Sequence, residues 1–165
     1  VELIQLMGWV NEEQIIKNKP AEIDELIKFH DLEYVKALKK AEEELDLPDY
    51  LKRKYNIGIG NNPIFSEVFS RPASAAKASI KAVEMIANKQ AKKILNISGG
   101  THHGRKSEAY GFCFLNDCVL GHQVRDDFNG FFEDVLVDLK NNLVMHCEDH
   151  KEFLLPTHLK NLVID

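Results

Sequence analysis

The stretch "SAAKASIKAVEMIANKQAKKILNISGGTHH", residues 74–103, determines the expected fold. Its first part predicts a helix with Ala76, Ile80 and Val83 on one face, and its small alanines permit close packing. The next part, "AKKILNIS" (91–98), predicts a short buried strand that runs directly into a Gly-Gly turn. A helix that returns to a strand is typical of a parallel α/β sheet, where ligand sites lie at the carboxyl ends of strands.

Two helices and a loop are predicted before this stretch. Apolar residues recur at helical spacing after Pro20, and Asp31 can cap a second helix. The apolar side of that second helix is expected to contain Tyr34, Val35, Leu38 and Leu45. Residues 52–74 are rich in Gly, Asn and Pro but keep many large apolar residues, which predicts an ordered loop.

The sequence after Leu120 has a different texture. Residues 122–158 mix acidic and aromatic residues without a clear period, and they form a divergent or inserted segment. The last residues, "LKNLVID" (159–165), predict another strand that ends on Asp165. Residues 1–165 are therefore interpreted as a single domain.

Composition and charge limit the function classes. The chain has 165 residues, 44% hydrophobic and 28% charged, as expected of a globular domain. A net charge of −5 gives no reason to expect nucleic acid or an anionic membrane as a partner. No apolar run reaches the length of a membrane span and no secretory signal is recognisable, so a cytoplasmic protein is expected. Three cysteines without framework spacing argue against a disulfide-stapled secreted domain.

The adjacent histidines His102 and His103 are the strongest candidates for chemistry. On a turn both rings can line one pocket, and imidazole titrates near neutral pH, so one ring can take a proton while the other donates or stabilises. Preceding glycines allow positive φ and close approach of a substrate. Gly111 in "YGFCF" can do the same for a second wall, with Phe112 as an apolar surface beside the entrance.

The segment "ISGGTHHGRKSEAYGFCFLNDCVLG" (97–121) resembles the active-site segment of the zinc-dependent histone deacetylase family. That family includes the bacterial acetoin-utilisation proteins and other acetylamine deacetylases. Weaker similarity in "FHDLEYVKAL" and "YNIGIGNNPIF" extends the resemblance over residues 20–121. It implies a three-layer α/β arginase/deacetylase-like fold with a parallel sheet, incomplete in this chain. It also implies a hydrolase that removes acetyl groups from lysine or a related small acetylamine.

The resemblance assigns roles to five residues. His102 is similar to the first histidine of the family's tandem pair, which stabilises charge while hydrogen-bonded to an aspartate. His103 is similar to the second, the general base for the zinc-bound water and general acid for the leaving amine. Gly111 would offer its carbonyl to the substrate amide. Phe112 would form one side of the tunnel for the acylated chain, and Cys113 would lie beside the pocket floor.

The zinc ligands implied by the family are absent from this sequence. Asp165 is similar to the first aspartate of the family's Asp-x-Asp-x-His segment, which partners the first tandem histidine and helps hold a monovalent cation. The zinc-binding Asp and His would follow it, beyond the end of the chain, so no metal ligand is assigned here. Asn61 stands where many relatives have an aspartate that holds the substrate backbone at the rim. A neutral amide binds two backbone N–H groups less strongly than a carboxylate does.

A second hypothesis is a catalytically inactive deacetylase-like fragment that acts only through association. The family's N-terminal strand, its transition-state tyrosine, its glycine-rich loop and its third zinc ligand are all missing from this sequence. Exposed edges of a partial parallel sheet would favour a homo-oligomer. We therefore expect this chain alone to bind no zinc tightly and to release no acetate from an acetyl-lysine probe.

Two further interpretations concern cysteine and histidine. His146 and His150 in "HCEDH" lie one helical turn apart, with Cys147 between them, a spacing that can hold zinc. No second ligand cluster accompanies them, so a surface helix with incidental histidines is favoured. Cys113 beside the histidine pair raises a thiol-nucleophile alternative, which lacks an obvious orienting partner. Cys118 is interpreted as a small core residue on the following helix.

Overall fold

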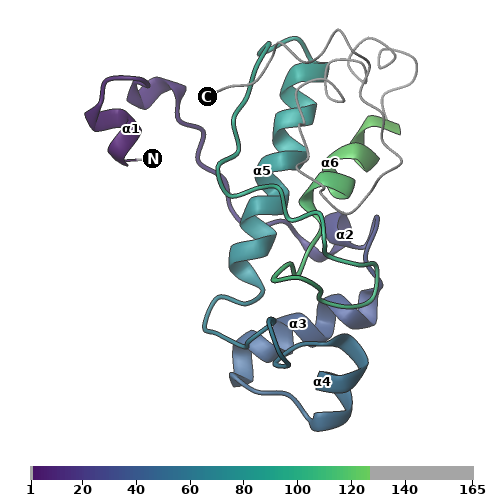
Figure 1. The fold of residues 1–165 in the computed structure, drawn as a ribbon. Coiled ribbons are helices and arrows are strands. Elements are labelled where there is room, and N and C mark those ends of the chain that lie inside the picture. Colours follow the sequence, from purple (N-terminus) through teal and green to yellow (C-terminus); the bar gives the residue numbers. More distant parts are fainter. Residues whose placement is uncertain (1, 127–165) are drawn as a thin grey trace, which may run out of the picture.

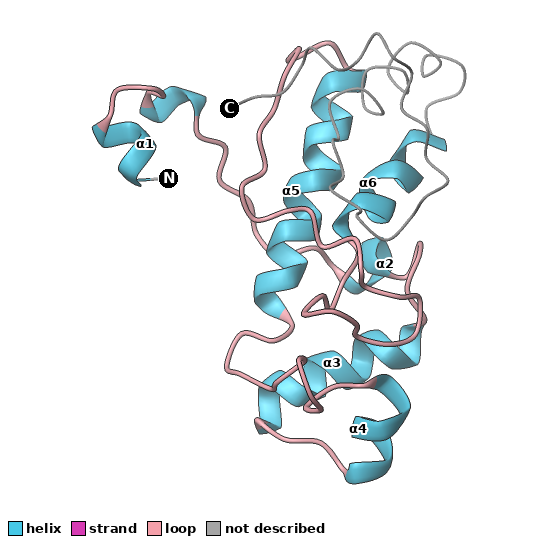
Figure 2. Cartoon of the chain, in the orientation of Figure 1, coloured by secondary structure: helices cyan, strands magenta, loops and turns pink. Residues whose placement is uncertain are grey.

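The computed structural model describes residues 2–126, which form six α-helices and one 3₁₀ helix joined by loops (Figures 1 and 2). The elements in chain order are α1 (Glu2–Leu6), η1 (Glu12–Gln14), α2 (Ile23–Leu26), α3 (Leu32–Glu44), α4 (Asp49–Tyr55), α5 (Ser70–Ala87) and α6 (Asp117–Asp126). Within residues 2–126 there is no strand, only two isolated β-bridges. None of the helices in this range is long and apolar enough to cross a bilayer.

Helix α5 is the long central element, and α6 packs along it (Figure 1). The buried face of α5 contains the predicted residues Ala76, Ile80 and Val83, because these positions recur every three to four residues. In α6, a Cβ at Gly121 would lie 3.4 Å from the Ser79 carbonyl oxygen, so the two helices approach closely at this point. The predicted helix and its core-facing side are confirmed.

Helix α3 crosses below α5 and buries Tyr34, Val35 and Leu38, as predicted (Figure 1). Asp31 is its N-cap residue, but the side chain makes no capping bond and instead accepts the Ser107 hydroxyl at 2.5 Å. The expectation for Leu45 is wrong. Leu45 adopts a left-handed conformation, φ 54°, which ends the helix, and its side chain is 60% exposed.

The predicted loop at 52–74 is only partly a loop. Helix α4 occupies its beginning and α5 starts before its end, at Ser70. Between the two helices the chain is irregular but ordered by its apolar residues. Ile57 and Val68 are fully buried, and Phe65 and Phe69 pack against the same core.

The predicted buried strand at 91–98 is wrong. This segment has no strand geometry in the structure, and Leu95 and Ile97 are 79% and 57% exposed. A strand requires a neighbour for its backbone N–H and C=O groups, and no residue in the range 2–126 pairs with this segment. The parallel sheet is therefore not confirmed here. The strand predicted at 159–165 and nearly all of segment 122–158 lie outside the described residues.

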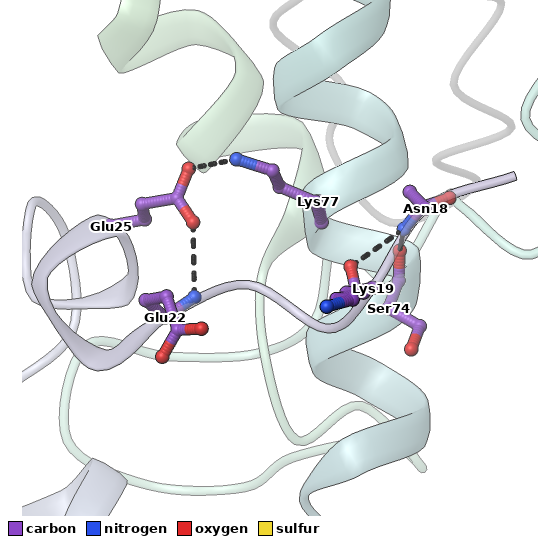
Figure 3. Close-up of polar contacts among 6 residues, drawn as sticks. All are labelled: Asn18, Lys19, Glu22, Glu25, Ser74 and Lys77. Carbon is purple, nitrogen blue, oxygen red and sulfur yellow. Dashed lines mark hydrogen bonds and ion pairs between the residues drawn. The ribbon is translucent and has the colours of Figure 1, made fainter.

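The connection that precedes α2 is bound along α5 (Figure 3). The amide of Asn18 donates to the Ser74 carbonyl at 3.0 Å, and Lys77 forms an ion pair with Glu25. Glu25 also accepts the backbone N–H of Glu22 at 3.0 Å, which caps the short helix α2. These contacts hold the start of the α2–α3 region against the central helix.

Candidate active site

The two adjacent histidines lie on a turn between α5 and α6, and their rings are neighbours. The ring centroids of His102 and His103 are 4.1 Å apart, with an interplanar angle of 43°. The N–H of His102 donates to the carbonyl of Gly100 at 2.9 Å and closes the turn. Gly100 has φ 89°, in the left-handed region. A turn thus brings both rings to one place, which a regular strand could not do because its side chains alternate between two faces.

The two rings differ in environment. Nδ1 of His102 lies 2.9 Å from the carbonyl oxygen of Gly100, and because a carbonyl only accepts, this nitrogen carries a hydrogen. Its Nε2 is buried and has no hydrogen-bond partner among the described residues. His103 is exposed, and its ring lies 6.3 Å from that of Tyr110. The His102 ring is therefore held in place with Nε2 buried and without a partner among the described residues, while the His103 ring is open to solvent.

The carboxylate of Asp117 fixes the residues just before the histidines. One oxygen, Oδ1, accepts the backbone N–H of Thr101 at 2.7 Å and its hydroxyl at 2.6 Å. The other, Oδ2, accepts the N–H of Gly100 at 3.1 Å and the hydroxyl of Ser79 on α5 at 2.6 Å. Asp117 is itself only 1% exposed. A buried charge is thus satisfied by four donors, and these tie the turn to both α5 and α6.

Asn116 fixes the other side of the histidine turn. Its side-chain amide donates to the carbonyls of His102 and Gly104, at 3.0 and 2.9 Å, on either side of His103. Its side-chain oxygen accepts the N–H of Val119 at 3.0 Å and so caps α6. The Asn-Asp pair, two residues of the motif that carried the resemblance, therefore clamps the turn from both ends.

His30 and Tyr34 of the upstream segment bind the same loop from below. Nε2 of His30 accepts the backbone N–H of Asn116 at 3.0 Å, and its Nδ1 lies 3.2 Å from the Lys106 carbonyl. The hydroxyl of Tyr34 donates to the Phe114 carbonyl at 2.5 Å. Burial of His30 lowers its pKa from 6.5 to about 4, so the ring is neutral at physiological pH.

A tight turn at residues 110–113 forms the second wall. Tyr110 and Cys113 exchange backbone hydrogen bonds of 3.0 and 2.9 Å, and the two residues between them have positive φ, 54° at Gly111 and 65° at Phe112. A Cβ at Gly111 would lie 3.1 Å from Cγ of His103, a tight contact, and φ 54° also favours glycine at this position. The Phe112 side chain is 69% exposed. Its backbone is in the left-handed region, which is unusual for a bulky residue.

The thiols beside the turn are poor nucleophiles. Sγ of Cys113 lies 3.4 Å from the Gly111 carbonyl oxygen, and its side chain is buried. Burial raises the pKa of the Cys113 thiol. Burial and the neighbouring Asp117 raise the pKa of Cys118 to about 12. Both thiols are protonated at neutral pH, which argues against the thiol-nucleophile alternative.

The structure brings together most of the predicted site residues. His102, His103 and Gly111 form one group, with Cys113 beneath the turn and Phe112 exposed beside it. Asn61 is exposed on the adjoining 58–62 loop. Asp165, and the histidines and cysteine at 146–150, lie outside the described residues.

Sequence reasoning assigned no role to four buried polar residues of the site: His30, Asn62, Asn116 and Asp117. All four stood in segments that carried the resemblance, and a polar residue within an apolar segment was the available signal. Their partners could not be read from the sequence, because His30 and Asn116 are 86 positions apart.

The described residues do not form a metal site by themselves. No group of three His, Cys, Asp or Glu side chains comes together between residues 2 and 126. The buried, unpartnered Nε2 of His102 nevertheless leaves one polar atom for a group supplied from elsewhere. Residues 2–126 therefore offer no complete ligand set for a metal.

Comparison with known proteins gives a consistent result. The sequence model of the histone deacetylase domain matches residues 1–138. The chain is 35% identical over 119 residues to histone deacetylase 8 of Xenopus tropicalis, an alignment covering 72% of this chain and 32% of the relative. It is 32% identical over 120 residues to histone deacetylase RPD3 of Saccharomyces cerevisiae, covering 72% and 28%. The chain thus spans about a third of the length of these relatives.

Solved structures show the same similarity. The crystal structure of an HDAC homolog from Aquifex aeolicus superposes with a TM-score of 0.70 at 31% identity, covering 75% of this chain and 33% of the other. The crystal structure of an HDAC homolog complexed with SAHA gives the same values. The described helices and loops therefore have the arrangement of the corresponding third of a histone deacetylase fold.

Proposed function

Because the chain belongs to the histone deacetylase family, we propose that it supplies the histidine pair and one substrate wall of a zinc-dependent deacetylase. The reaction is hydrolysis of the amide in acetyl-lysine or a related small acetylamine. The supporting observation is the contact between the two rings and the 110–113 turn. The ring centroids of His102 and His103 lie 4.1 Å apart, and a Cβ at Gly111 would lie only 3.1 Å from Cγ of His103.

The proposed chemistry divides between the chain and a metal. Zinc, whose ligands are expected beyond the C-terminus of this chain, would polarise the substrate carbonyl and acidify a bound water. His103 takes a proton from the attacking water and returns it to the leaving amine, for which its exposure is suited. His102 stabilises the charge that develops, and the proposal keeps Asp165 as the aspartate that partners this histidine. A monovalent cation near Asp165 belongs to the same proposal.

The 110–113 turn would bind the acylated chain. The Gly111 carbonyl accepts the substrate amide N–H, and the exposed Phe112 ring covers the methylene groups of the lysine-like side chain. Asn61, exposed on the neighbouring loop, would contact the substrate backbone at the rim. Because its amide is uncharged, we expect weaker retention of peptide substrates than a carboxylate would give.

An acetate-release assay tests this proposal. The full-length protein, meaning a form that also carries the zinc-binding residues this proposal requires, should deacetylate an acetyl-lysine peptide when loaded with zinc and be inhibited by a hydroxamate. His103→Ala should lower kcat by about 100-fold or more, the usual contribution of a general acid–base. His122→Asn, which changes an exposed histidine on α6, should leave kcat unchanged. No acetate release by the zinc-loaded wild type, or full activity of His103→Ala, would refute the proposal.

A non-catalytic role through association is the second candidate. The exposure of Leu95 and Ile97, on a 91–98 segment with no strand partner among residues 2–126, favours it, because nearby exposed apolar side chains promote contact with another chain. Sedimentation of the protein and of a Leu95→Ser, Ile97→Ser variant tests this role. A self-associating wild type, a monomeric variant and no acetate release from either would support it.

A further inference from the structure

Asn62 lies buried next to the exposed rim residue Asn61. It is 2% exposed, and the loop around it is closed by two backbone hydrogen bonds. The N–H of Gly58 donates to the Asn62 carbonyl at 2.6 Å, and the N–H of Asn62 donates to the Ile59 carbonyl at 3.0 Å. The side chain of Asn62 therefore leaves a rigid loop at a fixed place and points into the protein.

The Asn62 amide spans the turn that carries Phe112. Its oxygen accepts the backbone N–H of Phe112 at 3.1 Å, and its nitrogen donates to the Ala109 carbonyl at 3.3 Å. The Ala109 carbonyl precedes Tyr110 in the chain and the Phe112 N–H follows it. The Asn62 side chain therefore holds both the start of the turn, at Ala109, and its apex, at Phe112. An amide can do this because it offers an acceptor and a donor at once.

The two hydrogen bonds of Asn62 are not equally replaceable. The Ala109 carbonyl has a second and shorter donor, the side chain of Asn56 at 2.8 Å. In the described part of the chain, the Phe112 N–H has Asn62 as its acceptor and no other. The hydrogen bond that Asn62 alone supplies, among the described residues, is therefore the one to the Phe112 N–H.

Phe112 needs such an anchor. A non-glycine residue at φ 65° is disfavoured by the contact of its Cβ with its own backbone, and an exposed ring gains little from packing that could compensate. The turn itself is bonded through Tyr110 and Cys113, which leaves the apex free to change conformation. The two-residue turn between Tyr110 and Cys113 is compatible with positive φ at both central residues, and the bond from Asn62 is an additional contact on the left-handed residue Phe112.

We propose that Asn62 is a positioning residue that holds the Phe112 ring in register with the Asn61 rim, and so sets the width of the acyl-chain entrance. The inference rests on the proposed function for the substrate and for the roles of Phe112 and Asn61 at the entrance. Asn62 itself touches no substrate. It acts through the backbone of Phe112, and its loss should weaken binding of the acylated chain more than the chemical step.

The test compares three variants of the zinc-loaded, full-length protein. Asn62→Ala removes both bonds, Asn62→Asp keeps an acceptor for Phe112, and Asn56→Gly removes only the other donor to Ala109. Glycine suits position 56 because Asn56 has φ 53°. For each, kcat and KM on an acetyl-lysine peptide are measured with hydrogen exchange of the Phe112 amide.

Asn62→Ala should raise KM about fivefold with kcat changed less than twofold, in line with one net hydrogen bond. The Phe112 amide should lose its protection in the same variant. Asn56→Gly should keep KM and protection near the wild-type values, and Asn62→Asp, which keeps the acceptor but loses the donor to Ala109, should protect the Phe112 amide better than Asn62→Ala does. If Asn62→Ala does not fold, Asn62→Ser, whose side chain is one atom shorter and cannot span the same two groups, takes its place with the same expected results.

The opposite results are equally distinct. An unchanged KM in Asn62→Ala, an equal rise in Asn56→Gly, or lost Phe112 protection in Asn62→Asp would overturn the assignment. An inactive wild type would instead refute the proposed deacetylase function. The exchange of the Phe112 amide would then still decide whether Asn62 holds the turn, because that measurement needs no substrate.

Discussion

The backbone N–H of Asn116 donates to Nε2 of His30 at 3.0 Å and so joins the start of α3 to the loop that carries the histidine pair. This bond requires a neutral imidazole, because a protonated Nε2 has no lone pair to accept with. The other nitrogen, Nδ1, faces the Lys106 carbonyl. His30 therefore acts as a connector between α3 and the site only in one protonation state.

Stability should fall as the pH is lowered from about 6.5 to about 4. Unfolded His30 takes up a proton near pH 6.5, whereas the buried ring does so only near pH 4. Between these values the unfolded state binds more protons, so acid favours unfolding by up to about 3 kcal/mol. Above pH 6.5 this stability is fully present, and below pH 4 no more is lost through His30. Urea unfolding at a series of pH values measures the effect.

His30→Gln is the control for this prediction. Glutamine offers an acceptor and a donor but does not titrate, so the variant should lose the part of the pH dependence between 4 and 6.5. The nearby charged groups, Asp31 and Lys106, remain in both proteins. Parallel stability curves for the two proteins over this range would show that His30 is not the titrating group.

Asp117→Asn should destabilise the protein by about 3 kcal/mol. The substitution keeps the shape but replaces one acceptor oxygen by a donor, which then faces donors from Thr101 or from Gly100 and Ser79. Ser79→Ala removes only one of these bonds and should cost about 1 kcal/mol. Urea unfolding of both variants gives the comparison. Equal losses would mean that the carboxylate does not organise the turn.

Two glycine-to-alanine substitutions should act in opposite directions. At Gly104 an added Cβ would lie 2.9 Å from the Leu115 carbonyl carbon and 3.0 Å from the Asn116 nitrogen, both backbone atoms that cannot move aside separately. Gly104→Ala should therefore cost about 1–3 kcal/mol. At Gly121, inside α6, the closest atom is 3.4 Å away, so Gly121→Ala should stabilise by up to about 1 kcal/mol through helix propensity.

Thermal unfolding of the two glycine variants decides this prediction. The melting temperature of Gly104→Ala should fall and that of Gly121→Ala should rise relative to the wild type. A stabilised Gly104→Ala would mean that the 101–104 turn is free to move away from residues 115–116. A destabilised Gly121→Ala would mean that α5 and α6 pack more tightly than the 3.4 Å distance implies.

Local patterns in the sequence predicted the parts of the fold whose causes are local. The buried face of α5 followed from helical spacing, because periodicity reports directly which side of a helix is covered. The histidine turn followed from glycines before adjacent histidines. Helix α4 was missed because its sequence, "DYLKRKY", is charged on most sides and buries only Tyr55.

Long-range contacts explain what the sequence could not predict. The strand expected at 91–98 depends on a neighbouring strand, and local apolar character alone does not supply one. Glu42 on α3 accepts the N–H groups of Phe69 and Ser70 and so caps α5 from 27 positions away. Asn62 holds Phe112 across 50 positions. Such partners are chosen by the tertiary fold, so a single sequence gives the candidate residues but not the pairs.

Cys113 and Cys118 should resist alkylation in the folded protein. Only the thiolate reacts, and burial raises the pKa of both thiols, that of Cys118 to about 12. Treatment with iodoacetamide at pH 8, followed by mass spectrometry of the peptides, should show modification at least about tenfold slower than in urea-unfolded protein. The unfolded sample is the control for intrinsic reactivity. Rapid labelling of Cys113 in the folded protein would restore the thiol-nucleophile alternative, because a reactive thiol beside His103 would then need an explanation.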